Sequence, residues 1–169
     1  MVVSKEIQLD YGHTLPNHFS FCNQIHGHRA RVVAYVEGEV SPLGGDSSQG
    51  MVVDFKFLKA VMMEKVHDVL DHGFAVWEGD TEEIKALGGF AGEEVSTLDF
   101  IRARNRKVLV TTDPPTAETL AKWAFDQIKP TIPFGLTLVR VEWWETPSSC
   151  AIYELVKKSQ FDPRAKIGD

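Results

Sequence analysis

Residues that alternate between apolar and polar at both ends of the chain constrain its fold more than any other feature. Residues 6–11 and 29–40 show this period of two, which is typical of strands with one buried face. Two further strands are predicted at 136–145 and 150–158, where β-branched and aromatic residues are frequent. Since the strands come in pairs and do not alternate strictly with helices, the pattern favours an α+β fold with an antiparallel sheet.

Two amphipathic helices are predicted between these pairs of strands, both on one face of the sheet. Asp54 is a good N-cap for residues 55–70, whose apolar side chains recur at helical spacing. Thr116 is the N-cap expected for the second helix, whose apolar stripe ends before a proline. The segment at about 73–115 has no consistent period, so we expect it to be irregular except for a short strand at 106–112.

The length and charge of the chain limit the class of protein that it can be. Its 169 residues fit a single domain, which we expect to span residues 1–169. Its 24 acidic residues outnumber 18 Lys and Arg, and the net charge of −6 argues against binding to nucleic acid or anionic lipid. No apolar run approaches the ~20 residues of a membrane span, and the N-terminal residues do not resemble a secretion signal. We therefore expect a cytoplasmic protein that acts on a small molecule, with its two cysteines reduced.

Four of the six histidines lie between residues 13 and 28. His13 continues the apolar face of the first predicted strand, and His26 and His28 are in phase with the apolar face of the second. Adjacent strands lie about 4.8 Å apart, so three imidazoles can converge on one ion. Three histidines that leave a fourth position open are typical of a catalytic zinc site. The alternative for each histidine is a hydrogen-bonded residue of the core.

Cys22 and the pair Asp71–His72 are candidates for proton transfer. Cys22 precedes His26 closely enough to work beside a bound ion, to be its fourth ligand, or simply to fill the core. Asp71 and His72 end the first predicted helix, where the helix dipole and the neighbouring carboxylate would favour an imidazolium. The alternative role of this pair is a charged C-cap.

Glu145 is the residue whose carboxylate is the candidate for binding a ligand. It ends its predicted strand on the same face as Val141 and Trp143, whereas Glu142 points the other way. A buried carboxylate needs a partner. That partner is either a structural ion pair or the two N–H groups of a heterocycle with an amidine-like edge.

Five motifs that occur in order along the chain resemble those of the 6-pyruvoyltetrahydropterin synthase / 6-carboxytetrahydropterin synthase family. They are HTLPN from His13, CNQIHGH from Cys22, GMVVDF from Gly50, LDH from Leu70 and PTAETLA from Pro115. The resemblance implies a tunnelling fold, with a four-stranded antiparallel sheet and two helices on one face. It also implies a homohexamer, assembled through strand edges as a dimer of trimers, with active sites at subunit interfaces.

The same resemblance implies a zinc enzyme that acts on 7,8-dihydroneopterin triphosphate. It assigns roles by position: pterin anchoring to Glu145, proton exchange to Cys22, a proton relay to Asp71 and His72, and zinc binding to His13, His26 and His28. The spacing Cys-x3-His-Gly-His is similar to that of bacterial 6-carboxytetrahydropterin synthases, which release acetaldehyde and triphosphate in the biosynthesis of 7-deazaguanines such as queuosine. We therefore expect a lyase of this type. The alternatives are a 6-pyruvoyltetrahydropterin synthase, which eliminates triphosphate, and a non-catalytic zinc-stabilised module of the same fold.

Several parts of the sequence depart from the family pattern, among them the residues before His13 and the segment up to Pro115. Tyr11 and Gly12 precede His13, where small residues such as a pair of alanines are usual. The segment up to Pro115 is longer than in compact members, and its basic residues at 102–107 are expected to form a solvated loop rather than to bind triphosphate. The predicted metal ligands are unaffected.

Overall fold

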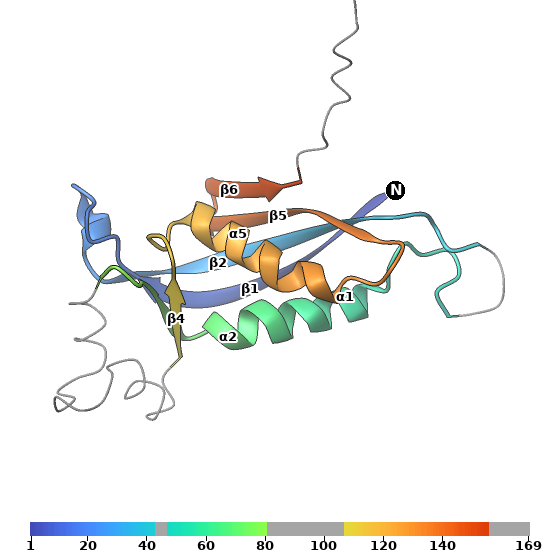
Figure 1. The fold of residues 1–169 in the computed structure, drawn as a ribbon, viewed down its shortest axis with the longest axis horizontal. Helices are drawn as coiled ribbons and strands as arrows, with labels where there is room; N and C mark the ends of the chain where they lie inside the picture. The colour runs from blue at the N-terminus through green and yellow to red at the C-terminus, as the bar shows by residue number, and fades with distance from the viewer. Residues whose placement is uncertain (43–46, 81–106, 156–169) are drawn as a thin grey trace, which may run out of the picture.

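The structure is a computed structural model that describes residues 1–42, 47–80 and 107–155. Its strands form one sheet in the order β4-β3-β1-β2-β5-β6 (Figure 1). The strand bounds are β1 Val2–His13, β2 His26–Glu37, β3 Gly73–Trp77, β4 Val108–Thr111, β5 Thr137–Thr146 and β6 Ser149–Glu154. The pairs β1–β2, β2–β5 and β5–β6 are antiparallel, whereas β1–β3 and β3–β4 are parallel.

The sheet therefore has six strands and mixed directions, and the prediction of a four-stranded antiparallel sheet is wrong. The parallel pairing arises because the chain crosses one face of the sheet as a helix after β2 and then re-enters beside β1. β3 has only five residues, GFAVW, and they show no alternation that would distinguish a strand from a loop. β4 lies within the short strand predicted at 106–112, whereas residues 81–106 lie outside the described part of the chain. The broader prediction of an α+β fold is confirmed.

Both predicted helices are present, and each begins at its predicted cap. The Asp54 carboxylate accepts the backbone N–H of Lys56 at 2.7 Å, and the Thr116 hydroxyl accepts that of Thr119 at 3.4 Å. The helical elements are α1 (Phe55–Met62), a π-helical turn η2 (Met63–His67), α2 (Asp68–Leu70), α5 (Ala117–Ile128), and the short 3-10 turns η1 (Phe21–Asn23) and η3 (Lys129–Thr131). The first three of these form one continuous helical segment. None of the described helices is long and apolar enough to cross a membrane.

Both helices pack against the same face of the sheet (Figure 1). Large apolar side chains fill the space between, including Leu58, Met62, Leu120, Phe125 and Trp143. Each such side chain stabilises the fold by about 1.5–3 kcal/mol. The other face carries charged pairs, such as Arg29 with Asp10 at 2.8 Å and Arg31 with Glu6 at 3.3 Å. The phase of each strand therefore decides whether a residue meets the apolar core or the polar face.

Candidate metal centre

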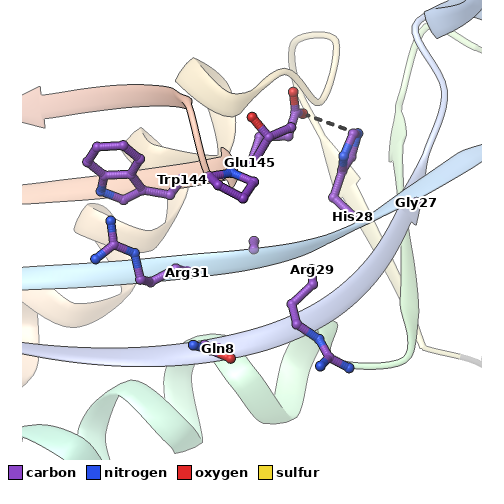
Figure 2. Close-up of a pocket in the computed structure, with 10 residues that line it drawn as sticks. Gln8, Gly27, His28, Arg29, Arg31, Trp144 and Glu145 are labelled. Carbon is purple, nitrogen blue, oxygen red and sulfur yellow. Dashed lines mark ion pairs between the residues drawn. The ribbon is translucent and has the colours of Figure 1, made fainter.

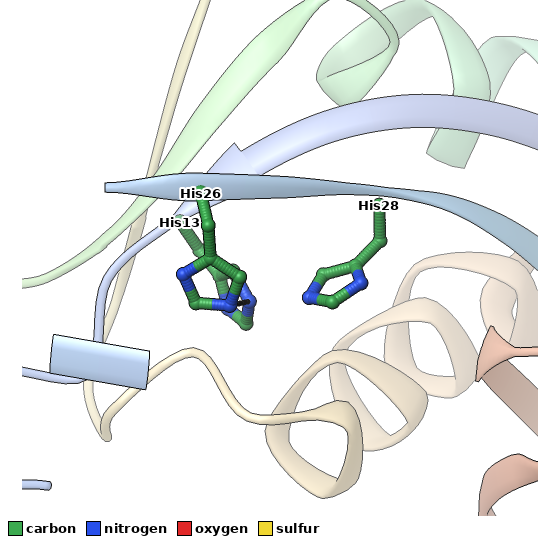
Figure 3. A group of neighbouring side chains, drawn as sticks. All are labelled: His13, His26 and His28. Atoms are coloured by element: carbon green, nitrogen blue, oxygen red, sulfur yellow. Dashed lines mark hydrogen bonds between the residues drawn. The ribbon is translucent and has the colours of Figure 1, made fainter. Parts of the chain in front are cut away.

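Three histidine side chains converge at one end of the helix-covered face (Figure 3). His13 ends β1 and pairs with His26, the first residue of β2, and His28 follows on the same face of β2. The candidate ligand atoms of the three rings lie within 4.8 Å of one another. The structure thus brings together the three residues that were predicted to bind a metal ion.

Hydrogen bonds at the second ring nitrogen orient two of these rings. Nδ1 of His13 lies 2.8 Å from the carbonyl oxygen of Pro115, and Nδ1 of His26 lies 2.8 Å from that of Gln24. A carbonyl oxygen only accepts, so each Nδ1 carries a proton and each neutral ring has a bare Nε2. The two Nε2 atoms are 3.0 Å apart. Two acceptors at this distance repel each other unless a cation lies between them, so the arrangement fits a metal ion.

Burial keeps the rings of His13 and His28 in the form that binds metals. Desolvation lowers the pKa of His13 and of His28, which favours neutral rings at pH 7. Nε2 of His28 is buried and has no hydrogen-bond partner among the described residues, a costly state for a polar atom that a bound ion would relieve. Three neutral imidazoles could therefore hold a divalent ion and leave a fourth position for a ligand.

Glu145 lies beside the histidines, on the strand face predicted for it. Its Oε1 is 3.7 Å from Nε2 of His13 and also from Nε2 of His28. Figure 2 shows the carboxylate and the His28 ring facing each other. A cavity of about 560 Å³ is lined by His28 and Glu145 and, for the rest, largely by residues of the opposite face such as Arg31 and Trp144. The two distances of 3.7 Å, rather than this cavity, place the carboxylate beside the histidine cluster.

Asp71 and His72 form a hydrogen-bonded pair where the first helical segment ends. Oδ2 of Asp71 lies 2.7 Å from Nδ1 of His72, and Oδ1 accepts the backbone N–H of Asp10 at 2.9 Å. Although burial opposes the shift, these two hydrogen bonds hold the pKa of Asp71 below its usual value. Among the described residues, Asp71 and His72 share no hydrogen-bond or ion-pair partner with the three histidines. The pair is formed as predicted, and no hydrogen bond or ion pair among the described residues links it to the three histidines, although His72 and His28 line the same surface pocket.

Cys22 lies in η1, in the connection between β1 and β2, and is half-buried. Its backbone carbonyl accepts the N–H of Leu15 at 2.9 Å, which closes this connection on itself. Its thiol is not part of the cluster of candidate ligand atoms found in the described residues. The structure therefore does not support Cys22 as the fourth ligand, and its role in proton transfer stays a prediction.

The sequence model of one protein family, described as 6-pyruvoyl tetrahydropterin synthase, matches residues 2–155. The chain belongs to this family. The family prediction made from the five motifs is thereby confirmed, and so is the prediction that the chain is an enzyme. The 6-carboxy-5,6,7,8-tetrahydropterin synthase of Haemophilus influenzae is 27% identical over 90% of this chain and 97% of its own length. The protein of the same name from Synechocystis sp. is 30% identical over 90% of this chain and 92% of its own.

Solved structures show how widely this fold is shared. The 6-pyruvoyl tetrahydropterin synthase of Caenorhabditis elegans aligns with a TM-score of 0.61 and 21% identity, over 92% of this chain and 96% of its own. An uncharacterized protein from Wolinella succinogenes aligns with a TM-score of 0.67 and 23% identity, over 91% and 97% of the two chains. These likenesses confirm the fold of the pterin synthase family, and they carry no information about the reaction.

Two side chains of this family member were not predicted as parts of a polar network. Tyr11 donates a hydrogen bond to Oε1 of Glu145 at 3.3 Å, and the available signal was its shared phase with His13 in β1. Glu142 is only 7% exposed, on the opposite face of the sheet. Its carboxylate is satisfied there by Tyr35 at 3.0 Å, Trp144 at 2.8 Å and Arg140 at 2.8 Å. Strand phase correctly placed Glu142 on that face but did not show that cross-strand donors would bury it.

Proposed function

We propose that this chain is a zinc-dependent lyase that converts 7,8-dihydroneopterin triphosphate and water into 6-carboxy-5,6,7,8-tetrahydropterin, acetaldehyde and triphosphate. The observation that carries this proposal is the convergence of three histidine side chains beside the carboxylate of Glu145. Relatives named 6-carboxy-5,6,7,8-tetrahydropterin synthase support the choice of product. We assign the reaction to the cytoplasm and to the biosynthesis of 7-deazaguanines such as queuosine.

Zinc is the ion that best suits the donor set. Three neutral imidazole nitrogens match the ligand preference of this tetrahedral, borderline-soft ion. His13, His26 and His28 would hold it, and the carbonyls of Pro115 and Gln24 would fix the tautomers of the first two rings. When bound, the ion supplies Lewis acidity that polarises the side-chain hydroxyls of the substrate.

Glu145 is proposed to bind and orient the pterin ring. The ring has a guanidine-like edge with two adjacent N–H groups, and a carboxylate accepts both in a charge-assisted, bidentate contact. The distance of 3.7 Å from Oε1 to the nearest histidine nitrogens supports this role. A ring held at Glu145 would direct its side chain towards the proposed metal position.

Cys22, Asp71 and His72 are proposed to move protons. A Cys22 thiolate would take a proton from the substrate side chain. His72, oriented by Asp71, would return a proton to the side-chain oxygens or to the cysteine, as in other general acid–base sites. No hydrogen bond or ion pair of the described residues links the pair to the histidines of the same chain, and we propose that the pair of a neighbouring copy completes each site in a homohexamer.

Mass analysis of the product tests the proposed reaction most directly. Purified, zinc-loaded protein is incubated with 7,8-dihydroneopterin triphosphate, and Cys22→Ala serves as the matched control. We expect 6-carboxy-5,6,7,8-tetrahydropterin together with equimolar acetaldehyde. A 6-pyruvoyl product without acetaldehyde would instead assign the chain to the triphosphate-eliminating reaction. No conversion by zinc-loaded protein would indicate a non-catalytic module, and either result would overturn the proposal.

A further inference from the structure

A buried chain of hydrogen bonds ends on the carboxylate of Glu145. The indole Nε1–H of Trp143 donates to the Tyr11 hydroxyl at 3.4 Å, and this hydroxyl donates to Oε1 of Glu145 at 3.3 Å. Tyr11 is only 4% exposed and Trp143 is fully buried. Tyr11 belongs to β1 and the other two residues belong to β5, so the phenol reaches past β2 to join the two strands.

The chemistry of the three groups fixes the direction of this chain. An indole N–H only donates, and an ionised carboxylate only accepts. The hydroxyl has a single proton, so it accepts from Trp143 and gives its proton to Glu145. Tyr11 therefore presents a donor to Glu145 in one orientation, whereas a water molecule in its place could turn.

The ring of Tyr11 is held by aromatic neighbours. Its centroid lies 5.2 Å from that of His13, 5.9 Å from that of His28 and 5.5 Å from that of Trp143, which it meets edge to face. Close packing of this kind leaves the hydroxyl little freedom to move. Oε1 of Glu145 is therefore held at a defined point beside the histidines. No hydrogen bond from the described residues reaches its Oε2.

We propose that Tyr11 is a positioning residue that holds Oε1 of the Glu145 carboxylate in place for a heterocycle with two adjacent N–H donors. This inference rests on the proposed role of Glu145 as the pterin anchor. A carboxylate that is already oriented loses less conformational freedom when the ligand binds, so the benefit appears as affinity. Tyr11 is not proposed to contact the reacting atoms, so the turnover of bound substrate should change little.

The test measures binding of 7,8-dihydroneopterin, which lacks the triphosphate, to the zinc-loaded protein by titration calorimetry. Tyr11→Phe removes only the hydroxyl and keeps the ring contacts. We expect Kd to rise ~10-fold, as for the loss of a hydrogen bond to a charged group. With 7,8-dihydroneopterin triphosphate, KM should rise by a similar factor while kcat and zinc content stay unchanged. Tyr35→Phe is the matched control, since it removes a hydroxyl that serves Glu142 on the opposite face.

A double-mutant cycle separates this inference from the proposed function. Glu145→Gln should weaken binding more than Tyr11→Phe, and adding Tyr11→Phe to Glu145→Gln should change Kd less than about twofold, because the two residues act through one contact. Weaker binding in Glu145→Gln but wild-type Kd in Tyr11→Phe would overturn the role of Tyr11 alone. Equal effects of Tyr11→Phe in both backgrounds would also overturn it. Wild-type affinity in Glu145→Gln would overturn the anchor itself.

A second variant keeps the inference testable if Tyr11→Phe does not fold. Trp143→Phe removes the donor that orients the Tyr11 hydroxyl while keeping an aromatic ring in the core. We expect this variant to bind 7,8-dihydroneopterin more weakly than the wild type, with unchanged zinc content. Unchanged affinity in a folded Trp143→Phe protein would contradict the inference.

Discussion

The carboxylate of Asp71 lies 2.7 Å from Nδ1 of His72, at the turn that ends the first helical segment. The aspartate is anchored, because its other oxygen accepts the backbone N–H of Asp10. The histidine is open, with a side chain that is 77% exposed and a backbone φ of 57° that turns it out of the helix. The pair therefore has a fixed end and a free end, which suits a group that serves the site of a second copy.

Subunit complementation tests whether two copies share one site. Asp71→Asn leaves the histidine cluster intact, and His26→Ala/His28→Ala leaves the Asp71–His72 pair intact. Each variant alone should lose at least ~10²-fold in turnover, because each lacks one part of the site. Hexamers assembled from a mixture of the two should regain a measurable fraction of wild-type turnover, since some interfaces then contain both intact parts.

Two results would contradict a shared site. Mixed assemblies that stay as inactive as their parents would place both parts of the site in one chain. A monomeric mass by light scattering at micromolar concentration would contradict the homohexamer itself. Open strand edges at β4 and β6 of the described sheet are the physical reason to expect assembly.

The lowered pKa of Asp71 predicts a specific acid sensitivity of the metal-free protein. The pKa in the folded chain lies below the ordinary value of 3.8, so between the two values the unfolded chain binds more protons. The carboxylate therefore stabilises the fold above about pH 4, and this contribution is lost as the pH falls through the folded pKa. Asp71→Asn should be less stable at neutral pH and should lose less stability than the wild type on acidification.

Denaturant unfolding between about pH 6 and pH 3 measures this effect. Asp68→Asn is the matched control, because its carboxylate is exposed on the same helical turn. The control should follow the wild-type profile. Parallel profiles for Asp71→Asn and the wild type would show that the Asp71 hydrogen bonds do not stabilise the fold.

Cys22→Ala distinguishes the three roles of this cysteine. If Cys22 transfers protons, the Cys22→Ala protein should fold, keep its zinc and bind substrate. Its turnover should nevertheless fall at least ~10²-fold. Zinc content, dihydroneopterin triphosphate binding and kcat are measured on the same preparation. Loss of zinc would make Cys22 a ligand, and full activity would make it a packing residue. Cys150→Ala controls for the loss of any thiol.

Periodicity was sufficient to predict most of the fold and the core of the site. The alternation in β1 and β2 placed His13, His26 and His28 on one face, because strand phase is a local property that the sequence displays. The caps Asp54 and Thr116 were likewise local. The sequence does not show that β1 and β5, which are far apart along the chain, contact each other. The hydrogen bond from Tyr11 to Glu145 therefore became visible only in the structure.

Two other features could not be read from the sequence, for different reasons. β3 is too short to show a period, and its parallel pairing depends on the path of the preceding helix. Glu142 carries a charge, which ordinarily predicts exposure, but donors from β2 and β5 satisfy it in a buried position. Both depend on tertiary contacts rather than on local pattern.

Metal analysis of the purified protein and its histidine variants tests the central claim, that the three converging imidazoles bind zinc. Wild-type protein should contain one zinc per chain. His26→Ala/His28→Ala should contain none after dialysis, whereas His18→Ala, which alters an exposed histidine outside the cluster, should keep full occupancy. Full zinc occupancy in the double variant would contradict the account, because the ion would then be bound by residues other than these histidines.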